Sequence, residues 1–168
     1  VLERLIRCGD LEGATDIFRS TSESPFLYFD LIDEAWTQHV ESNNDATFLD
    51  DIIDGCGFEI LSLDALKISH NEGEDRHRSE LCTLYIRENK NQFKLGYIDP
   101  PEKLARKDMR LTVDYPEDLI VCRAVYEKFK DSAPKMPLLD VVDFLDENKQ
   151  LLKLTSPFCE EGYNTMYL

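Results

Sequence analysis

Residues 109–129 read MRLTVDYPEDLIVCRAVYEKF and contain the clearest structural pattern of the chain. Apolar and polar residues alternate over residues 109–113, which predicts a half-buried strand. Asp114 ends this strand, and Pro116 is typical of the first turn of a helix. The stretch therefore predicts a strand, an acidic residue and a helix in succession, which is the repeating unit of an α/β protein.

The remaining sequence continues this alternation of strands and helices. Strand patterns occur at residues 14–20, 45–51, 58–61 and 93–98, and helix patterns at residues 2–12, 30–40, 62–69, 81–88 and 137–148. Residues 150–168 have no clear period. We expect an α/β fold with a largely parallel sheet.

Composition and charge narrow the classes of function. The chain has 168 residues, with 34 acidic and 19 basic side chains and a formal charge of −15. Because the basic residues are scattered, this charge argues against nucleic acid as a partner. The longest apolar runs have four residues, whereas a membrane span needs about 20, so we expect no membrane insertion. Five cysteines without a CxxC pair predict neither a disulfide framework nor a zinc site, and we expect a cytoplasmic location.

Two acidic residues, Glu23 and Asp114, follow predicted strands, and open α/β sheets bind ligands at the carboxyl ends of their strands. Both residues also have structural explanations. Asp114 is placed to cap the next helix, with Glu117 at the capping-box position, and the turn around Glu23 would accept most polar side chains. A cap and a metal ligand are compatible roles, since a carboxylate has two oxygens. The three histidines show no Ser/His/Asp spacing, so nucleophilic hydrolysis has little support.

Several stretches together resemble one protein family. Residues 111–129 fit a signature that reads roughly TVD-x-PEDL before an arginine-containing helix, and the matching residues are Thr112, Val113, Asp114, Pro116, Glu117, Asp118, Leu119 and Arg123. Upstream, residues 13–33, 58–66 and 78–86 resemble further segments in the same order. This succession is similar to the cytidylyltransferases of the acylneuraminate and 3-deoxy-manno-octulosonate type, including spore coat polysaccharide biosynthesis proteins.

The resemblance implies a Rossmann-like nucleotide-diphospho-sugar transferase fold, incomplete at its amino terminus. Residues 1–130 would form the carboxyl-terminal part of the cytidylyltransferase-like domain, and residues 131–168 a helical extension. The implied reaction transfers CMP from CTP to an acidic sugar for surface glycans and depends on Mg²⁺. By resemblance the metal ligands are Asp114 and Glu23, which stands where the family usually has Asp. The implied substrate contacts are Ser22, Glu59, Arg78 and Glu80.

One feature of the family has no counterpart here, the amino-terminal Gly-rich loop with Arg and Lys that holds the triphosphate. We therefore expect this chain to be inactive without such a segment, and a homodimer is a further expectation. The alternative function is a catalytically inactive, family-derived domain that serves interaction or oligomerisation.

Overall fold

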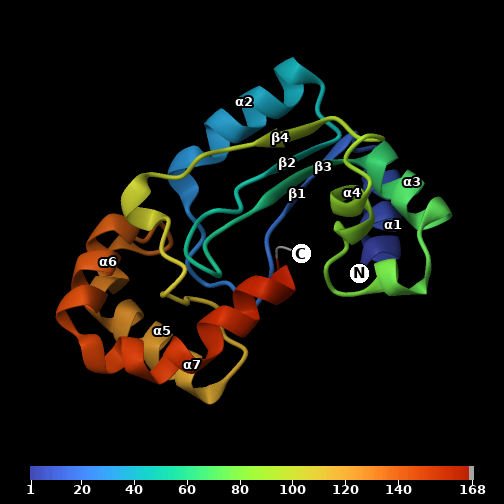
Figure 1. Cartoon of the computed structure of the whole chain (residues 1–168). Coiled ribbons are helices and arrows are strands. Elements are labelled where there is room, and N and C mark those ends of the chain that lie inside the picture. Colours follow the sequence, from blue (N-terminus) through green and yellow to red (C-terminus); the bar gives the residue numbers. More distant parts are fainter. Residues whose placement is uncertain (167–168) are drawn as a thin grey trace.

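A four-stranded mixed sheet forms the centre of the protein, with helices on both faces and a further group of helices beyond one end (Figure 1). The computed structural model describes residues 1–166, with side chains up to residue 160. The strands are β1 (Asp16–Arg19), β2 (Ala46–Phe48), β3 (Glu59–Ser62) and β4 (Leu95–Tyr97), in the order β1-β3-β2-β4. The helices are α1 (Leu2–Glu12), α2 (Ile32–Ser42), α3 (Leu63–Glu72), α4 (Leu84–Glu88), α5 (Pro116–Phe129), α6 (Leu138–Glu147) and α7 (Lys149–Met166). Short 3₁₀ turns cover Phe29–Leu31, Asp75–Arg78, Glu102–Leu104 and Lys130–Ser132.

The α/β class is confirmed, but the sheet is less parallel than expected. β4 is parallel to β2, whereas β3 lies between β1 and β2 and is antiparallel to both. Consequently β1, β2 and β4 point the same way, and two of the three pairings are antiparallel. The reason is the short connection over residues 49–58 from β2 to β3, because a parallel return would need a crossover of a dozen residues or more.

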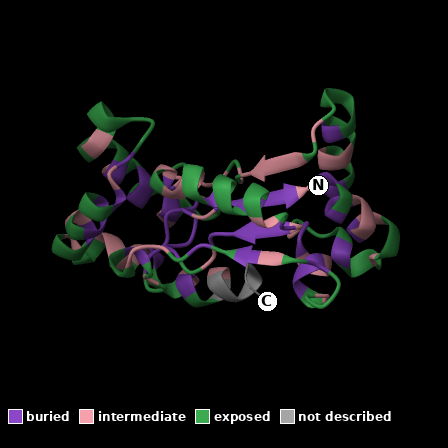
Figure 2. Ribbon diagram, turned by 90° about the horizontal axis from the view of Figure 1, so that it is seen from above, coloured by how far each residue is buried: buried purple, intermediate pink, exposed green. Residues whose placement is uncertain are grey.

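Alternate residues of the strands face two different buried clusters. Leu61 and Phe48 pack with α1, α3 and α4 in one cluster. Ile60 faces the opposite side, where Ala35 of α2 lies in the second and larger cluster. The buried residues run through the middle of the molecule, and the exposed ones follow the outer sides of the helices (Figure 2).

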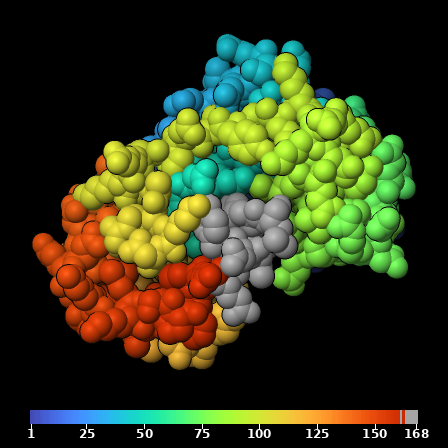
Figure 3. Space-filling view, viewed as in Figure 1, coloured from blue at the N-terminus to red at the C-terminus, as the bar shows by residue number. Residues whose placement is uncertain are grey.

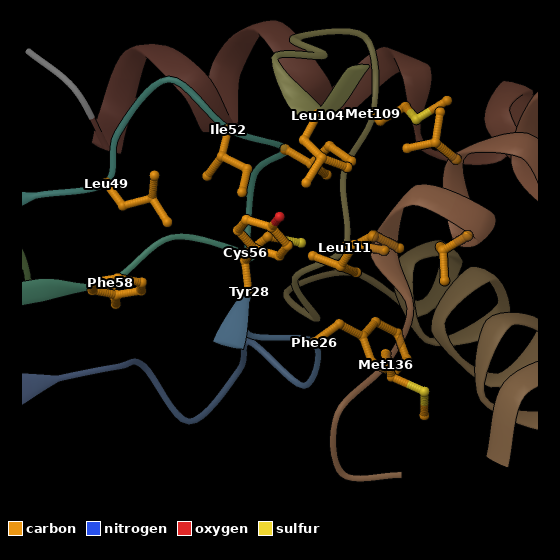
Figure 4. Close-up of a cluster of buried hydrophobic side chains, with 14 of the residues drawn as sticks. Phe26, Tyr28, Leu49, Ile52, Cys56, Phe58, Leu104, Met109, Leu111 and Met136 are labelled. Carbon is orange, nitrogen blue, oxygen red and sulfur yellow. The ribbon is translucent and has the colours of Figure 1, made fainter. Parts of the chain in front are cut away.

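The larger cluster joins the sheet to the carboxyl-terminal helices. Figure 4 shows Ile52 and Cys56 from the β2–β3 connection beside Leu104 and Leu111, with Leu49 of the same connection farther from them. Residues of α5 and α6 complete this cluster. In the space-filling view, the region of α3 and α4 and the carboxyl-terminal helices lie on opposite sides of the face shown (Figure 3). The β2–β3 connection is thus a packed part of the core that links the sheet to these helices.

The strand predicted for residues 109–113 is wrong. These residues run through the core without a ladder, and the segment has one isolated bridge, between Asp54 and Arg110. Met109 and Leu111 are fully buried, while Val113 is partly buried. Arg110 and Thr112 are buried as well, at 3% and 5% exposed, so the alternation of apolar and polar residues does not mark one buried and one exposed face. In the described residues, no strand runs beside this segment to form a ladder with it.

The beginning of α5 also differs from the prediction. Tyr115 is the N-cap, and Pro116 occupies the first helical position, so the third position belongs to Asp118 and not to Glu117. The Asp118 carboxylate accepts hydrogen bonds from the backbone N–H groups of Asp114 and Tyr115, both at 3.0 Å. Asp114 lies just outside the helix, and its side chain is left for other contacts.

The resemblance implied a helical extension over residues 131–168, but no periodic pattern located its last helix, α7. It extends over Lys149–Met166 with Pro157 inside it, and it packs on α5 and α6. None of the helices in residues 1–166 combines the length and the apolar character needed to cross a bilayer. The five cysteines are all free thiols.

Candidate functional site

A cavity of about 390 Å³ opens at the edge of the sheet where β1 and β2 end and the antiparallel β3 begins. This is the carboxyl edge of the parallel strands, where ligands of α/β sheets bind. The lining comes from the β1 end and the loop after it, from the β2–β3 connection, from residues 79–81 and from α4. Its apolar wall is made by Leu49, Phe58 and Leu81, and its remaining lining is mostly polar or charged. The volume is in the range of small-molecule sites.

Two arginines and two carboxylates form a network along this cavity. Glu59, at the start of β3, accepts from Arg19 Nη1 at 2.7 Å and from Arg87 Nη2 at 2.9 Å. Arg87 also makes a bidentate pair with Asp50, at 2.6 and 3.0 Å, and donates to Thr83 at 3.1 Å. The Arg87 guanidinium lies 3.9 Å from the centre of the Phe48 ring. The network therefore fixes the wall of the cavity to β1, β2, β3 and α4.

Burial controls the protonation of the groups around this network. Burial raises the pKa of Asp50, and the hydrogen bonds and charge of Arg87 oppose that rise. Burial also raises the pKa of the Cys82 thiol to about 11, with a further contribution from the negative charge of Glu59. A thiol with this pKa is protonated at neutral pH and is a poor nucleophile. The cavity thus offers charge and hydrogen bonds to a ligand, and this cysteine does not supply covalent chemistry.

A second cavity, of about 240 Å³, adjoins the first, and Thr21, Glu23, Ser24 and Glu80 line both. Arg110 dominates the second cavity. Its guanidinium is 3% exposed and pairs with three carboxylates, those of Asp54 (2.8 Å), Asp118 (3.0 Å) and Asp114. Burial raises the pKa of Asp54, and the positive charge of Arg110 is the main influence that opposes the rise.

The carboxyl-terminal helix forms part of the same cavity. Gly162 of α7 is among its lining residues, and a β-carbon at this position would overlap the Arg110 guanidinium and come within 2.8 Å of Asp54 Oδ2. Nearby, Phe158 stacks on Tyr115 with the ring centres 4.1 Å apart. The close approach of α7 to the buried ion pair thus requires glycine at 162.

The structure brings four of the six predicted site residues into these cavities. Glu23 and Asp114 both line the second cavity, and the Val113 N–H donates to the backbone oxygen of Glu23 at 2.9 Å. Glu59 lines the first cavity, and Glu80 lines both. The loop after β1 therefore lies directly against the segment that carries the TVD motif.

The other two predicted residues, Ser22 and Arg78, line neither cavity. Ser22 is exposed and donates a long hydrogen bond, 3.3 Å, to Glu23. Arg78 lies in the turn before α4, and its side chain is 48% exposed. This side chain contacts His70 of α3 and Asp75 of the same turn. Neither position supports the role in substrate binding that the sequence indicated.

Sequence reasoning missed the charged residues that organise the site: Arg19, Asp50, Asp54, Arg87 and Arg110. A signal is present for some of them, because they interrupt apolar stretches. Asp54 follows two isoleucines and Arg87 follows an isoleucine in a short helix. A charged residue in an apolar stretch indicates a buried partner, but the sequence does not name that partner.

The chain has sequence relatives in other organisms. No protein-family model matches the chain. An uncharacterized protein of Methanocaldococcus jannaschii, MJ1063, is 29% identical over 163 residues, which cover 97% of this chain and 66% of that protein. The spore coat polysaccharide biosynthesis protein SpsF of Bacillus subtilis is 26% identical over 149 residues, which cover 88% of this chain and 62% of SpsF.

A solved structure extends the comparison to the fold. The structure of a cytidylyltransferase from Leptospira borgpetersenii superposes with a TM-score of 0.77 and 17% sequence identity, over 90% of this chain and 64% of that one. The chain thus spans about two thirds of the length of these proteins. The likenesses bear out the resemblance seen in residues 111–129: the chain is a homologue of SpsF and has the fold of a cytidylyltransferase.

Proposed function

We propose that this chain forms the metal-binding and sugar-binding part of an enzyme that transfers CMP from CTP to a sugar hydroxyl during surface polysaccharide synthesis. The observation that carries the proposal is the position of Glu23 and Asp114, two acids from distant parts of the sequence, in the second cavity. This cavity adjoins the first one, which has the volume of a small-molecule site. CTP follows from the cytidylyltransferase fold, and polysaccharide synthesis follows from the relationship to SpsF. The acidic sugar, the homodimer and the inactivity of the isolated chain remain predictions.

In the proposed reaction, the sugar hydroxyl oxygen forms a bond to the α-phosphorus of CTP. The bond from that phosphorus to the bridging oxygen breaks, pyrophosphate leaves with the electron pair, and a carboxylate of the cleft accepts the hydroxyl proton. The apolar wall of Leu49, Phe58 and Leu81 would hold the sugar ring, and the carboxylates would accept hydrogen bonds from its hydroxyl groups. Holding the two reactants in line supplies much of the rate acceleration in such transfers.

The residues of the second cavity fit a Mg²⁺ ion. Among the described residues, Arg110 is the one cation that lines this cavity, and the four carboxylates that line it leave an excess of negative charge. Mg²⁺ usually takes one or two carboxylates together with substrate phosphates. In the described residues, no group of three or more His, Cys, Asp or Glu side chains is placed to hold a metal. Asp114 and Glu23 would be the protein ligands. When bound, Mg²⁺ would neutralise charge on the phosphates of CTP.

The test is release of pyrophosphate from CTP, UTP, ATP and GTP with Mg²⁺ and a panel of sugars, on this chain and on the complete gene product. We expect release with CTP in the complete protein, and a fall of about 100-fold or more in the Asp114→Ala variant, since the effect of losing charge stabilisation is of this size. Asp131→Ala is the matched control, because Asp131 is exposed and lines neither cavity.

Two outcomes would contradict the proposal. Near-normal turnover of Asp114→Ala would remove Asp114 from the metal site. Absence of pyrophosphate release from both proteins, with every nucleotide and sugar, would instead favour the alternative of a non-catalytic interaction domain.

A further inference from the structure

One buried acid, Asp118, is linked to the candidate metal ligand Asp114 by two separate routes. Asp118 is the third residue of α5, its side chain is 0% exposed, and it lines neither cavity. The Asp114 side chain, by contrast, is 47% exposed and lines the second cavity. Asp118 can therefore act on a ligand of that cavity only through the residues that it holds.

The first route goes through the backbone. Oδ2 of Asp118 accepts hydrogen bonds from the N–H groups of Asp114 and Tyr115, both at 3.0 Å. These two residues come directly before the helix, where a side chain at the third helical position can reach back to them. The bonds fix the main chain of Asp114 at the rim of the cavity.

The second route goes through Arg110. Its Nε donates to both oxygens of Asp118, at 3.0 and 3.1 Å, and its Nη2 donates to Oδ2 of Asp114. Because the guanidinium is planar and rigid, the orientation that Asp118 gives it decides where Nη2 meets Asp114.

The contacts of Asp114 leave one of its oxygens for a ligand. In the described residues, both side-chain donors to the Asp114 carboxylate reach Oδ2: Arg110 Nη2, and the Thr112 hydroxyl at 3.4 Å. The carboxylate is thus held by Oδ2 while its side chain stays half exposed in the cavity. Oδ1 is the oxygen that remains to bind a cation.

We propose that Asp118 is a positioning residue, which orients Asp114 for a divalent cation without binding that cation itself. The inference rests on the proposed function, whose metal site it deepens. A carboxylate that is already held in one orientation loses less entropy when it binds. Residues that hold metal ligands are typically worth about 10–100-fold in metal affinity.

Asp118→Asn tests this role, because asparagine cannot make both sets of contacts. Its side-chain amide has one acceptor oxygen and one NH₂ donor. If the oxygen faces the two backbone N–H groups, the NH₂ group faces Nε–H of Arg110. In the reverse orientation the NH₂ group faces the backbone donors, so either orientation brings donors together and breaks one route to Asp114.

Asp54→Asn is the matched control, because it also removes one negative charge beside Arg110. Asp54 Oδ2 accepts from Arg110 Nη1 at 2.8 Å, and an amide oxygen can keep this bond. Asp54 lines the second cavity, whereas Asp118 does not. An effect of charge alone would therefore be at least as large for Asp54→Asn as for Asp118→Asn.

The measurement is binding of Mn²⁺ alone to this chain, followed by the electron paramagnetic resonance signal of the free ion, with Asp114→Asn to locate the site. We expect Asp118→Asn to weaken binding by roughly tenfold or more. Asp54→Asn should weaken it by about twofold to fivefold, from the Coulomb energy of one charge near a divalent ion in a solvated, screened cleft.

Folding is measured separately, because both substitutions are in a buried ion pair. A merely structural role of Asp118 would lower the urea midpoint and leave the Mn²⁺ affinity of the folded protein unchanged. Circular dichroism shows whether each variant is folded. If one is not, all the proteins are compared again in about 1 M sucrose, which favours the folded state.

The outcomes separate this inference from the proposed function. If Asp118→Asn weakens Mn²⁺ binding no more than Asp54→Asn does, the inference is overturned and Asp114 remains a metal ligand. If the wild type binds no Mn²⁺, or Asp114→Asn does not weaken the binding, the metal site of the proposed function is lost together with the inference. The expected order of affinities without pyrophosphate release by the complete gene product would support the positioning role and contradict the enzyme.

Discussion

Replacing Arg110 with methionine should cost about 3–5 kcal/mol of unfolding free energy, the usual cost of removing one partner from a buried ion pair. The Arg110 side chain is 3% exposed, and its partners Asp54 and Asp118 are 5% and 0% exposed. Methionine keeps much of the volume but removes the charge and every hydrogen bond. Because a domain is stable by only about 5–15 kcal/mol, the loss should be large enough to measure without ambiguity.

The structure indicates which carboxylate loses the most stabilisation when Arg110 is removed. Asp118 keeps two backbone hydrogen bonds at 3.0 Å without Arg110. In the described residues, the Asp54 carboxylate accepts its hydrogen bond from Arg110, at 2.8 Å. The destabilisation should therefore come mainly from a charged, buried Asp54. A second change, Asp54→Asn, removes that charge and should recover about 2 kcal/mol, roughly half of the loss.

The assay is urea unfolding followed by far-UV circular dichroism for the wild type, Arg110→Met, and Arg110→Met with Asp54→Asn. Arg123→Met is the control, since Arg123 is exposed on α5, and its effect should stay within about 0.5 kcal/mol. Burial raises the pKa of Asp54 in the folded state, and loss of Arg110 should raise it further. The deficit of Arg110→Met should then shrink as the pH falls from 7 toward that raised pKa, because the folded state takes up the proton. A loss below about 1 kcal/mol, or no recovery by Asp54→Asn, would refute the reasoning.

Three further predictions follow from single contacts. Gly55→Ala should destabilise the fold by about 2–5 kcal/mol, because φ is +89° and the new β-carbon would lie 2.5 Å from a backbone nitrogen. Gly13 has φ +63° and no atom close to the position of a β-carbon, so Gly13→Ala should cost only about 1–2 kcal/mol in the same urea titration. Ser62→Ala removes the N-cap of α3 and should cost about 1 kcal/mol by thermal unfolding, and a change below 0.3 kcal/mol would contradict that role. Arg106 lowers the pKa of Asp146 through its hydrogen bonds, so the urea midpoint of Arg106→Gln should lie below that of the wild type at pH 7. The two midpoints should approach each other as the pH falls below about 3.8 through the lowered pKa, because Asp146 then loses its charge. A difference that stays constant with pH would count against this ion pair.

The sequence predicts the helices better than the sheet. Periodic apolar residues locate α1, α2, α5 and α6, because one buried face repeats along each helix. Helix α7 was expected only as part of a helical extension over residues 131–168, because Pro157 interrupts a stretch without clear period and its bounds could not be located. The antiparallel direction of β3 is missed although the sequence contains a signal for it, since a connection as short as residues 49–58 favours an antiparallel pair. The alternation of strands and helices elsewhere in the chain led instead to the expectation of a largely parallel sheet.

Among the described residues that line the two cavities, the sequence analysis names four of the six acids and none of the three arginines. Glu23 and Asp114 are expected because each follows a strand or strand-like segment, and the structure brings them to one cavity. The roles of Arg19, Arg87 and Arg110 could not be predicted, because a buried arginine is explained by carboxylates that are distant in the sequence. Arg110 and Asp54, for example, are 56 positions apart.

The position of β3 between β1 and β2 has a consequence for synthesis on the ribosome. β1 pairs with no strand except β3 in the described sheet, so a nascent chain that has emerged only through β2 has two strands and no ladder between them. At about 5–20 residues per second, synthesis of the 43 residues from the end of β1 to the end of β3 takes roughly 2–9 s. During that interval the hydrogen-bonding groups of β1 have no partner strand, which makes this part of the nascent chain a natural binding site for chaperones.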